Sequence, residues 1–236
     1  TGLYAAIVAA IAGALWGSSI HLHTGPTNST SLLVLEREVY EDEGFKAMLL
    51  DAAASLETGS VWAFENKIGS LVDRPAGKLA HALEHLDKGE SWLLPPAYAD
   101  NDNPYMLRPA IRWGTKRGDF CHANELFGPV LSVICAEDLD DAINIVNATG
   151  YGLTSGIESL DEREVQRWKE ALIAGNLYIN RPTTGAIVLR QPFGGMRKSA
   201  IGSSKKAGGP NYVTQFVNIT AEIGPRQSDH PLLKKL

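Results

Sequence analysis

Residues 21–36, HLHTGPTNSTSLLVLE, bring together side chains that could carry chemistry, just ahead of an apolar run. His21 and His23 supply imidazoles, and Thr27 and Asn28 supply a hydroxyl and an amide. The stretch contains no cysteine. A threonine hydroxyl without a neighbouring base is a poor nucleophile, whereas a cysteine is partly thiolate even at its free pKa of about 8.5. The segment is therefore either a catalytic stretch or the place where a catalytic residue is missing.

A second candidate is HALEH, residues 81–85, which has the H-x-x-E-H spacing of one class of zinc site. On a helix, His81 and His85 would lie on one face and could share a Zn²⁺ ion, with Glu84 as general base. Five residues make a weak pattern, and a third ligand at a convincing position is not apparent. The favoured interpretation is a surface helix with two solvated histidines and no metal.

Two further segments combine glycines with polar or aromatic side chains. In NELFGPVLSV, residues 124–133, Glu125 and Phe127 precede Gly-Pro and an apolar strand. This order places a carboxylate in a loop beside the edge of a sheet, where it can accept hydrogen bonds from sugar hydroxyls. In INRPTTGAIVLRQPFGGMRKSAIG, residues 179–202, four glycines suit a backbone that approaches a ligand closely. Taken alone, glycine-rich segments of this kind are more often plain turns.

The elements that position these residues are clearest in the C-terminal half. Helical spacing of apolar residues predicts helices over 138–150, with Asp138 as cap, and over 159–175, with Ser159 and Glu162 as a capping box. Continuous apolar runs predict strands over residues 129–136, 152–159 and 176–180. Strand, helix, strand, helix, strand with short connections predicts an α/β fold with a parallel sheet and flanking helices.

The N-terminal half is less regular. Helices are predicted over 35–59 and 74–89, and a long loop over 91–109, where Pro, Asn and Asp are dense. Residues 3–16 are apolar throughout, but they are shorter than the ~20 residues of a membrane helix and lack the positive start of a signal peptide. They are interpreted as a buried strand that runs into a buried helix.

Composition limits the partners and the compartment. The net charge of −5 leaves no basic surplus to displace counterions from phosphates, which argues against nucleic acid as a partner. Nothing in the sequence predicts a membrane segment. The 2 cysteines, Cys121 and Cys135, are too few for a disulfide framework, so a reducing cytoplasm is expected.

Four segments together resemble the aldehyde dehydrogenase superfamily, and within it the L-glutamate γ-semialdehyde (Δ1-pyrroline-5-carboxylate) dehydrogenases of proline-utilisation type. They are ELFGPVL, TGYGLTSGIESLDERE, GNLYINR and TTGAIVLRQPFGG with KAGGPNYV. The resemblance runs from about residue 32 to about residue 216. It implies an oxidoreductase of proline metabolism that uses NAD and acts on a small-molecule aldehyde.

The resemblance also implies roles for individual residues. Glu125 matches the glutamate that holds the nicotinamide ribose of NAD, and Phe127 matches the aromatic residue near the ring. Phe193 matches an aromatic that lines the aldehyde pocket, where it would exclude water from a reactive acyl intermediate. A glycine loop binds the substrate's α-carboxylate and α-amino groups through its backbone. The residues that match this loop are Thr184, Gly185 and Ala186.

The nucleophile of the superfamily is a cysteine that attacks the aldehyde before hydride passes to NAD. It normally stands shortly before the run that reads TSLLVLE here. Counting back without a gap puts Thr27 at its position, and a gap of one residue puts Asn28 there. Neither can do the chemistry. Cys135 sits in mid-strand and is expected to lie in the core, and Cys121, four residues before Glu125 on the cofactor side, is not expected to replace the nucleophile. We therefore expect the chain alone to be inactive.

The resemblance implies that a dinucleotide-binding half precedes the matching region, and no G-x-G-x-x-G loop occurs near the start of the chain. We expect a catalytic-type domain over residues 1–210. Residues 211–236 are expected to be an oligomerisation strand and tail that join copies into a homo-oligomer. The predicted function is NAD-dependent oxidation of L-glutamate γ-semialdehyde to L-glutamate. The alternative is a non-catalytic assembly partner of an intact dehydrogenase.

Overall fold

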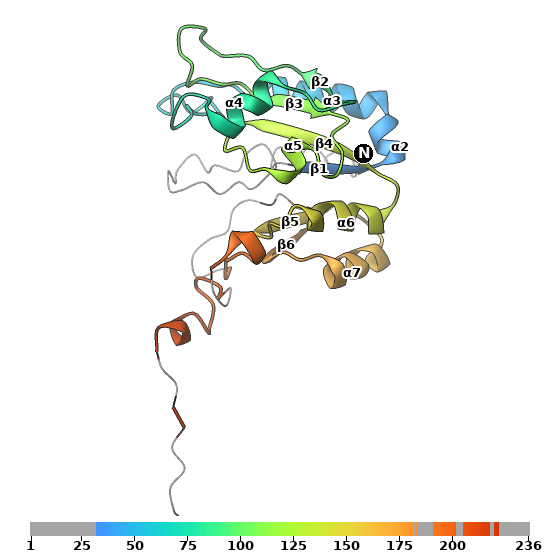
Figure 1. The fold of residues 1–236 in the computed structure, drawn as a ribbon, viewed down its shortest axis with the longest axis vertical. Helices are drawn as coiled ribbons and strands as arrows, with labels where there is room; N and C mark the ends of the chain where they lie inside the picture. Colours follow the sequence, from blue (N-terminus) through green and yellow to red (C-terminus); the bar gives the residue numbers. More distant parts are fainter. Residues whose placement is uncertain (1–31, 182, 184–190, 202–204, 218–219, 222–236) are drawn as a thin grey trace, which may run out of the picture.

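A computed structural model describes residues 32–181, 183, 191–201, 205–217 and 220–221. The strand and helix predicted within residues 3–16, and the positions Thr27 and Asn28, lie outside the described residues. Within them the chain forms two sheets with helices around them (Figure 1). No helix of the described part is long and apolar enough to cross a membrane.

The main sheet has the order β1-β4-β3-β2. Its strands are β1 (Leu32–Glu36), β2 (Ser91–Leu94), β3 (Ala110–Trp113) and β4 (Val130–Ala136). β1, β4 and β3 are parallel, whereas β2 is antiparallel to β3. The sheet is therefore mixed rather than purely parallel. The loop predicted over 91–109 is wrong at its start, because an edge strand tolerates the register shift in β2 and the prolines that follow it.

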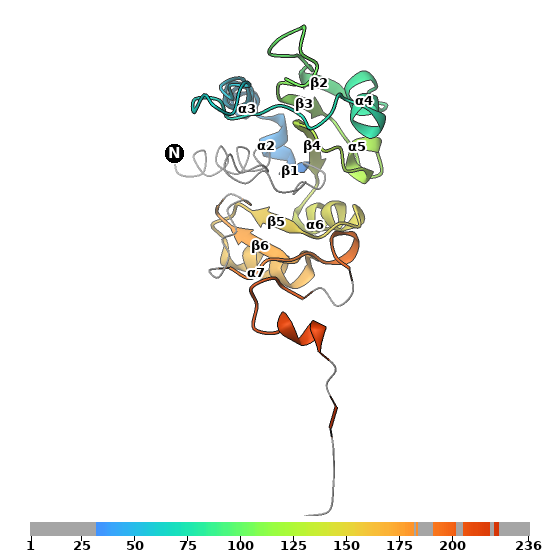
Figure 2. The same cartoon turned by 90° about the vertical axis from the view of Figure 1, so that its left-hand side faces the viewer.

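Helices cover both faces of the main sheet (Figure 2). α3 (Glu43–Ala54) packs on one face through Phe45, Leu49 and Ala53, which recur every four residues and are buried. α4 (Gly77–Glu84) and the short α5 (Phe120–Ala123) lie on the other face. The helix predicted over 35–59 is shorter than expected. It is preceded by β1 and the single turn α2 (Arg37–Glu41), because Asp42 caps α3 and starts a new helix there.

The second sheet contains β5 (Thr154–Ile157) and β6 (Asn176–Ile179), which are parallel and joined through α7 (Glu162–Ala171). The three predicted strands of this half are formed. However, β4 pairs with β1 and β3, while β5 pairs with β6, so the expected single sheet is two sheets.

α6 (Leu139–Ala148) lies between the two sheets, below β1 in Figure 1. One side of α6 packs against β4 and β1 through Ala142 and Ile145. Its other side, which includes Ile143 and Val146, joins the core formed with α7. α6 is therefore buried from both sides, which explains its dense apolar sequence.

The helix starts were partly predicted. The Asp138 carboxylate accepts the Asp141 N–H at 2.8 Å, which confirms it as the cap of α6. The capping box at Ser159 and Glu162 is wrong. Asp161 caps α7 and accepts the Arg163 N–H at 2.8 Å, while the Ser159 hydroxyl accepts the Asp161 N–H one step earlier. The Ser159 hydroxyl is engaged with the Asp161 N–H and the Glu164 carboxylate, so Asp161 caps the helix instead.

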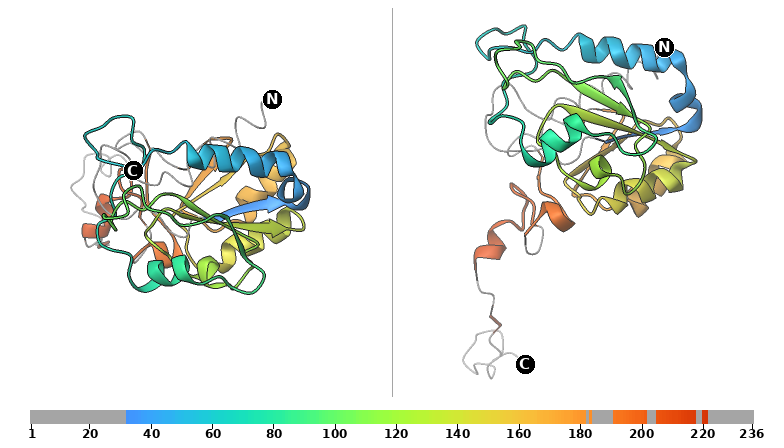
Figure 3. Two further views of the ribbon diagram at one scale, coloured as in Figure 1. Left: turned by 90° about the horizontal axis from the view of Figure 1, so that it is seen from above. Right: turned by 45° about the horizontal axis from the view of Figure 1, so that its top comes forward.

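Residues 211–217 lie away from the body of the molecule (Figures 1 and 3). The strand expected at the start of residues 211–236 is not formed over the described residues 211–217, since Val213–Phe216 is a 3₁₀ turn. A strand needs a neighbour for its backbone groups. Here local bonds take that place, and the Thr214 hydroxyl donates to the Asn211 carbonyl at 2.7 Å. Val213 and Phe216 are exposed.

Candidate functional site

The loop over residues 124–129 connects α5 to the start of β4. The Ala110 N–H donates to the Pro129 carbonyl at 2.9 Å, which fastens the end of the loop to β3. The Asn124 side-chain amide donates to the Phe120 carbonyl at 3.0 Å, which caps the C-terminal end of α5 where the loop begins. Glu125 is half-buried, and Phe127 is 53% exposed with a φ of 54°. The loop therefore presents a carboxylate and an aromatic ring from a fixed backbone.

Contact with α4 determines how closely the backbone of this loop approaches the helix. A Cβ atom added to Gly128 would lie 2.6 Å from Leu79 Cδ1, so a larger residue there would require the Leu79 side chain to move. Burial raises the pKa of the Glu125 carboxyl, and the nearby charge of Lys78 on α4 opposes that shift. The carboxyl thus occupies a partly desolvated position with one cation near it.

A buried ion pair lies behind α4, and the sequence did not predict it. Arg112 on β3 is 1% exposed and pairs with Glu90, whose side chain is 0% exposed. Glu90 also accepts the Thr115 hydroxyl at 2.5 Å and the Asp87 N–H at 2.7 Å. Burial alone would raise the pKa of Glu90, but the bonds from Arg112 and Thr115 hold it below its usual range. The one signal in the sequence is an arginine within the apolar strand AIRW.

The loop that carries Phe193 follows β6. Phe193 and Ala207 exchange two main-chain bonds, with N–H to carbonyl distances of 3.0 and 2.9 Å. The next carbonyl, that of Gly194, accepts the Asn176 side-chain amide at 3.1 Å and also the Lys206 ammonium. The predicted substrate loop, Thr184 to Ala186, lies outside the described residues. Phe193 is thus held by the main chain and by donors that converge on one carbonyl.

The two histidines of HALEH are exposed, as the favoured interpretation predicted, but only His81 lies within the helix. α4 ends at Glu84, and His85 has an extended backbone beyond it. The His81 and His85 rings stack at 4.6 Å, and Phe120 packs on His81 at 4.2 Å. Among the described residues, three potential metal ligands come within 4.8 Å of one another only at Asp87, Glu90 and Asp119, a group without histidine.

The two cysteines are poor nucleophiles where they stand. Cys121 on α5 is buried, and burial raises the pKa of its thiol to about 11. Burial also raises the pKa of the Cys135 thiol on β4. Both thiols are therefore protonated at neutral pH. The thiolate, rather than the thiol, is the nucleophile.

A model of the aldehyde dehydrogenase family matches residues 5–221. The chain belongs to the aldehyde dehydrogenase family. The relatives confirm the resemblance to the proline-utilisation branch. 1-Pyrroline-5-carboxylate dehydrogenase 1 of Halalkalibacterium halodurans is 32% identical over 183 residues, which are 78% of this chain and 35% of that protein.

Two solved structures are similar over most of the chain. Proline Utilization A (PutA) from Corynebacterium freiburgense has 37% identity and a TM-score of 0.80, and the match covers 98% of this chain and 24% of that one. A 1-pyrroline-5-carboxylate dehydrogenase from Thermus with bound NAD has 25% identity and a TM-score of 0.74, over 90% of this chain and 40% of that one. The chain spans about a third of the length of the curated relatives it matches, and 35% of the Halalkalibacterium halodurans protein.

Proposed function

We propose that the chain is the catalytic-type part of an enzyme that oxidises L-glutamate γ-semialdehyde to L-glutamate with NAD. The observation that carries the proposal is the Glu125–Phe127 loop, because it offers a carboxylate and an aromatic ring from a fixed backbone. The names of the relatives support the substrate, and the NAD bound to the Thermus protein supports the cofactor.

The residues present fit a dinucleotide. The Glu125 carboxylate has no hydrogen-bond donor among the described residues, so its oxygens are free to accept ribose hydroxyls. The exposed Phe127 ring beside it offers an apolar face to a planar group. When bound, NAD would accept a hydride from the substrate. Phe193 would wall the aldehyde pocket, and Thr184, Gly185 and Ala186 would hold the substrate's charged end.

Binding of NAD to the purified chain tests the cofactor site. We expect addition of NAD to shift the NMR signals of residues 124–128, and Glu125→Gln to weaken binding because an amide nitrogen replaces one acceptor oxygen. Glu84→Gln is the matched control, since Glu84 is an exposed carboxylate on α4. Shifts that are unchanged by Glu125→Gln would contradict the assignment.

The chain alone should not turn over, because the nucleophile position falls at Thr27 or Asn28. Formation of NADH from an aldehyde by the purified chain would overturn this expectation. Its intact mass, together with peptide sequencing across residues 1–36, would decide whether a cysteine stands there.

We also propose that copies of the chain form a homo-oligomer in the cytoplasm through the segment after residue 210, where exposed apolar residues extend from the body. The alternative function, a non-catalytic assembly partner of an intact dehydrogenase, is favoured by the missing cysteine. Sedimentation velocity of the chain, alone and mixed with an intact homologue, tests both. A monomer that binds no homologue contradicts them.

A further inference from the structure

The Arg112–Glu90 ion pair is buried, and a contribution to stability alone does not explain why two charges are removed from water. A buried ion pair often contributes no more than two apolar side chains of the same size would, because both charges lose their water. The pair lies at 1% and 0% exposure, so it cannot touch a substrate or cofactor. Its contacts, rather than its net stability, indicate what it does.

The first set of contacts fixes α4. The Arg112 Nη1 group donates to the carbonyls of Ala82 and His85, at 2.8 Å for His85, which are free carbonyls at the C-terminal end of the helix. The Trp92 ring covers the guanidinium at 5.3 Å. One turn before Ala82, Leu79 packs against Gly128 of the Glu125–Phe127 loop.

The second set of contacts fixes α5. The Asp87 N–H donates to Glu90, and the Asp87 carboxylate accepts the Phe120 N–H at 2.7 Å, at the start of α5. At the other side of α5, the His122 Nδ1 atom accepts the Gly118 N–H at 3.1 Å, and Nε2 lies 2.8 Å from the Ile145 carbonyl. These two bonds require a neutral ring with its proton on Nε2.

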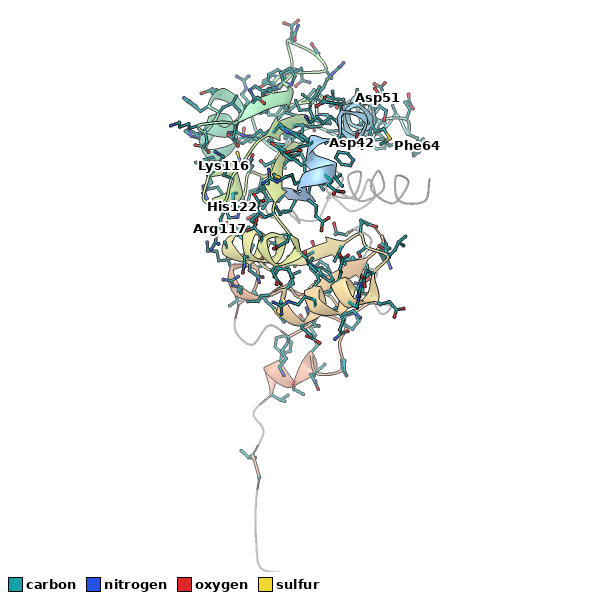
Figure 4. The ribbon with its side chains drawn as sticks, turned by 90° about the vertical axis from the view of Figure 1, so that its right-hand side faces the viewer. Asp42, Asp51, Phe64, Lys116, Arg117 and His122 are labelled. Atoms are coloured by element: carbon teal, nitrogen blue, oxygen red, sulfur yellow. The ribbon has the colours of Figure 1, made fainter. Side chains whose placement is uncertain are left out.

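Both sets of contacts therefore meet where Arg112, on β3, pairs with Glu90. Figure 4 shows His122 and Lys116 on the side opposite Asp42 and Phe64. Ile111 and Trp113 belong to the core on the α3 face, so the side chain of Arg112 between them lies on the α4 and α5 face. α4 supports the loop from beside Gly128, and α5 leads directly into it. We propose that Arg112 and Glu90 are positioning residues that fix the Glu125–Phe127 loop through α4 and α5.

The functional meaning of this positioning rests on the proposed role of Glu125 in holding NAD. The positioning itself does not, so it is tested without any cofactor. Two readouts report on the loop in the full chain. They are the hydrogen-exchange rates of amides 124–128 and the pKa of the Glu125 carboxyl, which ¹³C-labelled glutamate reveals by NMR and Glu125→Gln assigns.

Arg112→Lys is the informative variant. It keeps the charge, but an ammonium is a compact point donor that cannot bind Glu90 bidentately and reach both helix carbonyls. We expect loop amides to exchange about tenfold faster or more, since the loop opens locally more often. We also expect the pKa of Glu125 to fall towards its ordinary value as the carboxyl regains water.

Arg112→Met/Glu90→Leu separates positioning from folding, because apolar residues replace the pair without leaving a lone charge. We expect it to be less stable than the wild type but more stable than Glu90→Leu, because only neutral groups such as the His85 carbonyl lose a partner, while loop exchange rises as in Arg112→Lys. Arg37→Met is the control, since it removes a half-exposed arginine paired with Glu137 elsewhere. Wild-type exchange and wild-type Glu125 titration in Arg112→Lys would overturn the proposal. Absence of NAD binding by the wild-type chain would instead count against the proposed function only.

Discussion

The two loops proposed to form the site are held in different ways. The Glu125–Phe127 loop is supported by side chains buried in the core, with Arg112 and Glu90 at the centre. The Phe193 loop is supported by a main-chain bridge to Ala207 and by donors to one carbonyl. The first loop therefore depends on residues close to it in the fold. The second depends on a segment that also leads into the exposed C-terminal part.

The largest effect is expected where the first loop loses its buried pair. Glu90→Leu leaves the Arg112 guanidinium buried without its partner, which should cost about 3–5 kcal/mol of unfolding free energy. Urea unfolding measures the cost. Glu137→Gln, which weakens an exposed pair with Arg37, should stay within about 0.5 kcal/mol of the wild type. Equal losses in the two variants would mean that burial of the pair is unimportant.

For the Phe193 loop, the largest loss of unfolding free energy is expected from a substitution at Gly175. A Cβ added to Gly175 would lie 1.9 Å from the Gly194 carbonyl oxygen, so Gly175→Ala must displace the backbone next to Phe193. We expect a loss of about 1–3 kcal/mol by urea unfolding. Gly69→Ala is the control, since its Cβ would meet only Val61 at an ordinary 3.5 Å. A Gly175→Ala protein as stable as this control would show that the Phe193 loop yields freely.

A smaller effect is expected from the cation that supports the second loop. Lys206→Met removes the donor that the Gly175 and Gly194 carbonyls share, which should cost about 1–2 kcal/mol because both are partly buried. Amide exchange at Phe193 should rise with it. Lys205→Met changes an exposed lysine one residue earlier and should leave that exchange unaltered.

The smallest effects are expected in the pH dependence of stability. Ionisation of Glu90 and ionisation of Glu125 should change the free energy of unfolding in opposite directions. The folded pKa of Glu90 is lowered, so it stabilises above its unfolded pKa of about 4.3 and loses this as the pH falls through the folded value. The folded pKa of Glu125 is raised by burial, so its charge opposes folding and is relieved as the pH falls through that value. We would measure the urea midpoint from about pH 3 to about pH 7. In Glu90→Gln its dependence on pH should weaken at the acidic end of this range, and in Glu125→Gln it should weaken at the neutral end.

The sequence predicted what depends on local periodicity. β4 and α6 were found because their apolar spacing is regular and Asp138 marks the helix start. β2 was missed because four residues before two prolines read as loop, and its pairing partner β3 lies beyond a long connection. The pair of Arg112 with Glu90 was missed because 22 residues separate them in the chain. Glu125, Phe127 and Phe193 were found through their motifs, and no local pattern indicates what supports them.

The burial of α6 from both sides limits how the two sheets can move. Only Glu137 and Asp138 separate β4 from α6, so the connection has no length to act as a hinge. Interfaces packed on both sides of one helix allow small sliding displacements rather than rotation. The part of the protein that carries Phe193 should therefore shift relative to the part that carries Glu125 by small sliding movements along α6.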